Sequence, residues 1–154
     1  MKLEALLTRE INDLFDETFE QVKGIYLDRG TSLFETLATV SAEEASVPVS
    51  DTCASIAAQV DHVRFYLDVL ERAMRGEEIG EINWDDSWTL RLVSDEEWAE
   101  LNARLRESYR SVRELAESLD DWSGDNQLAD TLAVIVHTAY HLGEIRQALC
   151  TVKQ

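Results

Sequence analysis

Apolar residues recur at spacings of three and four along most of the chain, and this period predicts α-helices and not strands. A first amphipathic helix is expected over Leu3–Lys23, with Gly24 ending it. A shorter helical piece over Ser32–Val40 follows a break at Gly30 and is expected to continue the first helix. The N-terminal quarter therefore supplies one interrupted helix.

Three further helices are expected, and polar residues mark where two of them begin. Ser50 or Asp51 is placed to cap the second helix. Ser94 and Glu97 form a capping box at the start of the third. Gly124 precedes the fourth. The three helices are predicted over residues 51–75, 94–119 and 126–150.

The connections decide how these helices pack. Residues 41–51 hold the only proline and read as a connection, whereas residues 77–93 show no clear period. That second connection is long enough to cross a bundle, so the second and third helices can run parallel. With 154 residues, the chain suits one domain over residues 1–154 with a single core. The prediction is an all-α four-helix bundle with a long crossover between helices 2 and 3.

Composition and charge exclude some classes of protein and of binding partner. The chain is 45% hydrophobic and 29% charged, which excludes disorder. A formal net charge of −17 repels phosphate, so neither nucleic acid nor an anionic membrane is expected as a partner. No apolar run is long enough for a signal peptide or a membrane span, which predicts a cytoplasmic protein. Cys53 and Cys150 form no CxxC pair and are expected neither to bridge nor to bind metal.

Histidine is rare in this chain, and two of the three histidines lie four residues apart. His137 and His141 therefore share one face of the fourth helix, with Cβ atoms about 5–6 Å apart. Val134 and Ile145 lie on the same face, so it is expected to point inward. Two buried, unpaired imidazoles are costly, and a shared metal ion would relieve that cost.

His62 lies beside the apolar stripe of the second helix and would complete a three-histidine site if the two helices are neighbours. Three imidazoles leave a coordination position open, as in catalytic sites. Such ligands suit zinc or nickel, allow iron or copper, and disfavour magnesium and calcium. The alternative interpretation is three ordinary core histidines. Thr138 stands where a zincin HExxH motif has its general base, which argues against a metalloprotease.

The fourth helix resembles the C-terminal signature of the DinB-like (damage-inducible) superfamily, a HxxxHxGxIRQxL-type helix. Residues 137–149 read HTAYHLGEIRQAL, and residues 54–63, ASIAAQVDHV, match the earlier element that carries a lone histidine. The resemblance implies an up-down-down-up four-helix bundle, often a homodimer, with zinc or nickel on three histidines. It also implies kinship with thiol-dependent S-transferases and a mycothiol-dependent maleylpyruvate isomerase.

Two more side chains are candidates for catalytic roles. Glu144 follows His137 and His141 at i+7 and i+3 and stands where many relatives carry Gln. It is a candidate for accepting an imidazole N–H, for ligating the metal or for acting as a general base; the alternative is a surface ion pair. Tyr66, one turn after His62, shares the presumed site face and is either a hydrogen-bond donor or a core residue.

The leading functional hypothesis is a metal-dependent enzyme that activates a low-molecular-weight thiol for transfer to an electrophilic small molecule. A metal-hydroxide hydrolase is one alternative. A non-catalytic, metal-stabilised helical binding protein is another. Trp84 and Trp88, in the long connection, are expected either to cover the site as a lid or to anchor the loop.

Overall fold

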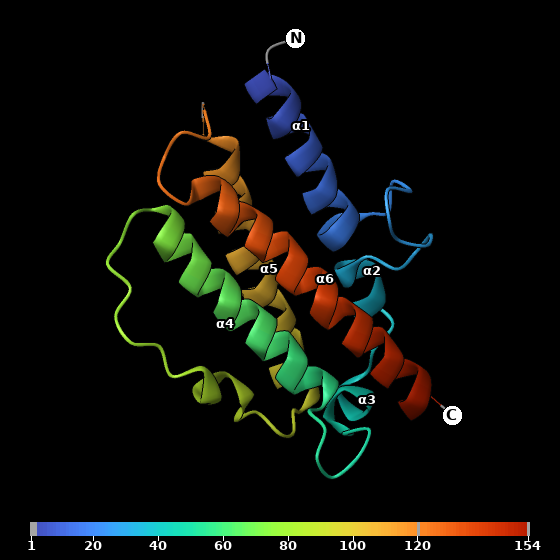
Figure 1. Cartoon of the computed structure of the whole chain (residues 1–154). Coiled ribbons are helices and arrows are strands. Elements are labelled where there is room, and N and C mark those ends of the chain that lie inside the picture. The colour runs from blue at the N-terminus through green and yellow to red at the C-terminus, as the bar shows by residue number, and fades with distance from the viewer. Residues whose placement is uncertain (1–2, 120, 154) are drawn as a thin grey trace.

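The computed structural model describes residues 3–119 and 121–153, and the regular elements in those ranges are all helical (Figure 1). They are α1 (Leu3–Phe15), the π-helical turn η1 (Asp16–Glu20), α2 (Leu33–Leu37), α3 (Ala42–Ser46), α4 (Ile56–Met74), the 3-10 turn η2 (Trp84–Trp88), α5 (Asp95–Glu117) and α6 (Gln127–Val152). None of these helices is long and apolar enough to cross a membrane. The all-α prediction is confirmed.

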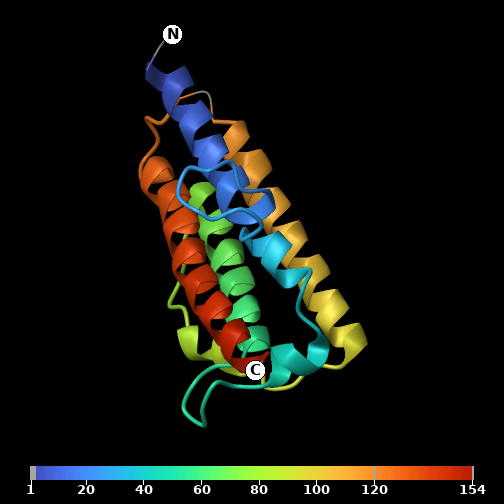
Figure 2. The ribbon, with the colours of Figure 1, turned by 90° about the vertical axis from the view of Figure 1, so that its right-hand side faces the viewer.

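The four long helices lie side by side in a bundle. Figures 1 and 2 show α1 and α6 running in one direction and α4 and α5 running in the other. The crossover, residues 75–94, joins the parallel helices α4 and α5 and passes along the outside of α4 (Figure 1). Because α4 packs against both α5 and α6, side chains on its two inner faces reach both neighbours.

The capping residues decide where the helices begin. The capping box of Ser94 starts α5 as predicted. The second predicted helix begins later than expected, because Ser55 caps α4 and the chain from Ser50 to Asp51 is a turn. The predicted connection over residues 41–51 also contains α3, which has its own capping box at Ser41.

A buried carboxylate ends the first helix early. The Glu17 side chain is fully buried in η1 and accepts hydrogen bonds from five consecutive backbone N–H groups, those of residues 23–27. These bonds fold the chain back after Glu20, so the predicted helix over Leu3–Lys23 is wrong in its last three residues. The expected continuation over Ser32–Val40 is instead the separate short helix α2, which follows a loop.

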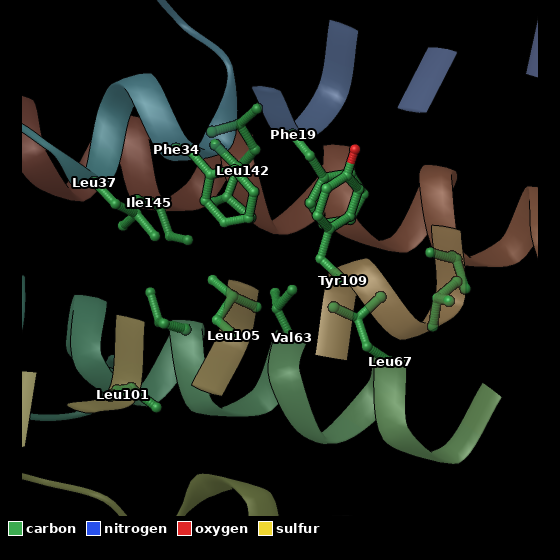
Figure 3. Close-up of a cluster of buried hydrophobic side chains, with 14 of the residues drawn as sticks. Phe19, Phe34, Leu37, Val63, Leu67, Leu101, Leu105, Tyr109, Leu142 and Ile145 are labelled. Atoms are coloured by element: carbon green, nitrogen blue, oxygen red, sulfur yellow. The ribbon is translucent and has the colours of Figure 1, made fainter. Parts of the chain in front are cut away.

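One hydrophobic cluster joins the helices, with members from α1 to α6. At its centre the Tyr109 ring of α5 stacks on Phe19 at 4.4 Å and meets Phe34 edge-on at 5.4 Å (Figure 3). Leu142 and Ile145 of α6 face the same cluster. The inward side of α6 is therefore fixed by packing, and this fixes the direction of His141 and His137, which lie one and two turns before Ile145.

Replacing Glu17 by Gln is expected to lower the free energy of unfolding by about 2 kcal/mol at pH 7, because a buried charged acceptor of several N–H groups becomes neutral. Burial pushes the pKa of Glu17 upward, but the backbone donors outweigh it and hold the pKa below 4.5. The Glu17 contribution is thus complete above pH 4.5 and is lost as the pH falls through the lower, folded pKa.

Urea denaturation at pH 7 and pH 4 measures this effect, with the exposed Glu20→Gln as the matched control. The two variants should differ clearly at pH 7, and the difference should be smaller at pH 4. Equal stabilities at pH 7 would contradict the role given to the buried carboxylate.

Candidate metal centre

The fold brings the three histidines together. His62 projects from α4, and His137 and His141 project from the facing side of α6. One nitrogen from each ring can be chosen so that all three lie within 4.8 Å of one another. His62 and His141 are only 7% and 4% exposed, and His137 is half-buried. The expected convergence of two helices on one point is thus what the structure contains.

The buried imidazoles are neutral at physiological pH. Burial, with the neighbouring His141, lowers the pKa of His62 to about 4. Burial, with both neighbouring rings, lowers the pKa of His137 to about 3. Burial also lowers the pKa of His141, although Glu144 partly opposes the shift. Each ring therefore offers an unprotonated nitrogen, as a metal ligand must.

The geometry of the donors fits a divalent ion. His62 Nε2 and His137 Nε2 lie 3.1 Å apart. Zinc–nitrogen bonds of about 2.0–2.1 Å in a tetrahedron separate two ligand nitrogens by about 3.3–3.4 Å, so this pair is close to the required spacing. The other ring nitrogen of His137, Nδ1, is buried without a hydrogen-bond partner among the described residues. A metal ion on Nε2 would not supply a partner for this nitrogen, so the ring is positioned by stacking on Tyr66 and not by a polar neighbour among the described residues.

Polar side chains hold the outward nitrogens of the other two rings. His141 Nδ1 lies 2.6 Å from Gln59 Oε1 and 3.0 Å from Glu144 Oε2. His62 Nδ1 lies 2.7 Å from Ser87 Oγ. These contacts leave the Nε2 atoms of both rings directed toward the common centre. The arrangement matches metal-binding histidines, whose second nitrogen is usually held by a hydrogen bond.

Glu144 lies beside His141 in the structure, and sequence reasoning offered it several roles there but did not assign Gln59 and Ser87 to the site. Gln59 lies three residues before His62 and so on the same side of the helix, a signal the sequence does contain. Ser87 lies in the crossover, where no period exists to show which residues face the bundle. Only the folded crossover identifies it.

Aromatic rings enclose the histidines. Tyr66 stacks on His137 at 3.6 Å, and Trp88 stacks on His62 at 4.0 Å. Trp84 lies 5.8 Å from Tyr66 and 6.4 Å from His62, measured between ring centroids. The two tryptophans of η2 therefore both anchor the crossover and cover the histidines, so the two interpretations of these residues are not exclusive.

The cysteines take no part in this cluster. Cys53 and Cys150 are both free and exposed, and neither belongs to the group of side chains that could share an ion.

Comparison with known protein families found a match. The family model described as the DinB superfamily matches residues 26–145, which include α2 to α5, most of α6 and all three histidines. Comparisons with curated proteins and with solved structures found no match.

Substituting Phe for His137 is expected to flatten the pH dependence of stability in protein stripped of metal. The unfolded imidazole titrates near 6.5, whereas the folded one has a pKa of about 3. Below pH 6.5 the unfolded chain binds the proton and the folded chain does not, so stability is complete above 6.5 and falls toward the folded pKa. Phe keeps a flat ring against Tyr66 but has no titrating nitrogen.

Urea denaturation with a chelator present, at pH 7 and pH 5, measures the difference. The wild type should lose about 2 kcal/mol more than the variant on acidification. Parallel losses in the two proteins would show that His137 is not held neutral by the fold.

Proposed function

The chain belongs to the DinB superfamily, and we propose that it is a metal-dependent enzyme of the thiol S-transferase type. In this proposal His62, His137 and His141 hold one zinc or nickel ion, and a low-molecular-weight thiol is transferred to an electrophilic small molecule. The observation that carries the proposal is the cluster of three neutral imidazoles from two helices. Three protein ligands leave a position for a substrate.

A divalent ion in this place supplies a Lewis acid that lowers the pKa of a thiol and so provides a thiolate nucleophile at neutral pH. The chain's own residues orient the ligands and shape the surroundings. Gln59 and Glu144 accept from His141 Nδ1 and direct its Nε2 inward. This contact favours Glu144 as a positioning acceptor over the ligand and general-base roles.

Tyr66, Trp84 and Trp88 are proposed to contact the substrate and not to hold the metal ligands. Burial, with the charge of Asp130, raises the pKa of Tyr66, so its hydroxyl keeps its proton and serves as a hydrogen-bond donor. Trp84 and Trp88 exclude water from the histidines and offer flat faces to an aromatic electrophile. Two free cysteines support a cytoplasmic location, where reduced thiols are maintained.

The direct test is thiol transfer by zinc- or nickel-loaded protein to a chloro-nitroaromatic acceptor, with bacillithiol, mycothiol, glutathione and coenzyme A tried in turn. Turnover should require the metal, and each of His62→Ala, His137→Ala and His141→Ala should lower it at least 100-fold while lowering the bound metal measured by elemental analysis. Cys53→Ala, away from the cluster, is the control and should leave turnover unchanged.

The outcomes separate the three hypotheses. Ester hydrolysis without any thiol would favour the hydrolase. Tight metal binding with neither activity, together with a large fall in melting temperature on chelation, would favour the structural binding protein. Absence of turnover with every thiol rejects the transferase.

We also propose that two copies associate through the outer face of α6. Leu132, Val136 and Tyr140 form one stripe at i, i+4 and i+8, and Val136 and Tyr140 are 67% and 64% exposed. Gly143 and Gln147 lie on the same exposed side of the helix, and Glu144 places a carboxylate at its edge beside Tyr140. On a chain of net charge −17, this largely uncharged stripe is the surface that two identical copies can bring together with the least repulsion.

Val136→Glu is expected to convert a dimer to a monomer, because a C2 contact buries each new carboxylate against the same face of its partner. Sedimentation velocity measures the mass. Leu92→Glu, at a 73% exposed position in the crossover, is the matched control and should not change it. A wild-type chain that sediments as a monomer at every concentration would end this part of the proposal.

A further inference from the structure

Ser87 is the single hydroxyl that the crossover buries against the histidines. It lies in η2, is 2% exposed, and its Oγ lies 2.7 Å from His62 Nδ1. Its neighbours Trp84 and Trp88 pack on the same imidazole from the sides. The one fully buried residue of the crossover, which the structure describes throughout, is therefore in direct contact with one of the three candidate ligands.

A second hydrogen bond of Ser87 shows which atom donates in the contact between Ser87 and His62. Ser87 Oγ also lies 2.6 Å from the carbonyl oxygen of Trp84, a group that can only accept. The single hydroxyl proton is donated to that carbonyl, so toward His62 the oxygen acts as an acceptor. The proton between Ser87 and His62 consequently belongs to Nδ1 of the imidazole.

This assignment selects the tautomer that a metal requires. An imidazole whose proton on Nδ1 is donated to Ser87 carries a lone pair on Nε2. That nitrogen faces His137 Nε2 at 3.1 Å, within the cluster of candidate ligands. Without Ser87, neither tautomer of His62 would be preferred by a neighbour on the Nδ1 side.

We propose that Ser87 is a positioning residue that fixes the metal-binding tautomer of His62 and thereby couples metal binding to docking of the crossover. Metal on Nε2 and the Ser87 bond at Nδ1 favour the same tautomer, so each strengthens the other by the same free energy. The proposal rests on the three-histidine metal centre but on no particular reaction. In this proposal residues 84–88 contribute to metal binding and do not only shield the histidines.

The coupling is tested by metal affinity and by backbone amide exchange in the full chain. Zinc and cobalt(II) affinities are measured by competition with a chromophoric chelator, for the wild type, Ser87→Ala and Thr89→Ala. Thr89 is the matched control, since its exposed hydroxyl donates to the Asp86 carbonyl in the same turn but does not contact a histidine.

Ser87→Ala is expected to bind zinc at least tenfold more weakly, and Thr89→Ala within twofold of the wild type. Zinc should slow amide exchange over residues 84–88 in the wild type and in Thr89→Ala, but much less in Ser87→Ala. Ser87→Thr, which keeps the hydroxyl, should recover the affinity. Equal zinc affinities for the wild type and Ser87→Ala would overturn the proposal while leaving the three-histidine centre intact.

A second measurement needs no variant. In metal-free wild-type protein, the ¹⁵N chemical shifts of the His62 ring should report a proton on Nδ1. A proton on Nε2 would overturn the proposal, even if Ser87→Ala did not fold. A wild type that binds neither zinc nor cobalt would overturn the metal centre itself, and with it the role of Ser87.

Discussion

The packing of α4 against α6 is the contact on which the candidate site depends. Imidazoles are costly to bury without partners, and at one point this interface buries two of them and half-buries the third. Each ring is neutral because the surrounding protein disfavours its charged form. The same burial that makes the rings poor bases makes them available as neutral nitrogen ligands, so the chemistry of the site follows from where the helices pack.

The crossover is the second structural requirement. Its course along α4 brings η2 against His62, where the Ser87 hydroxyl meets Nδ1 of the ring. α4 and α6 between them hold the histidines and two of the groups that orient His141, whereas the group that orients His62 comes from the irregular segment. The site therefore has one half built from regular helices and one half built from the irregular crossover.

Some parts of the fold could be predicted from residues that lie close together in the sequence. The capping box at Ser94 was found because its signal lies within four residues and depends on no distant contact. The histidine pair on α6 was found for the same reason, since helical spacing alone places the two rings on one face. The end of α1 was misjudged because Glu17 gathers N–H groups from a loop that no helical pattern describes. The start of α4 was misplaced because Ser50, Asp51 and Ser55 are all acceptable caps, and packing selected the last.

The sequence by itself determined that the chain is helical, which family it resembles and which three side chains are candidate ligands, because these depend on residue type and on spacing within one helix. Only the tertiary structure decided that His62 meets the other two, that Glu144 lies beside His141 Nδ1, and that Ser87 holds His62 Nδ1. These contacts join residues of separate segments or depend on a side chain's direction. Their distances are set by how α4, α6 and the crossover pack, which no local pattern of apolar and polar residues encodes.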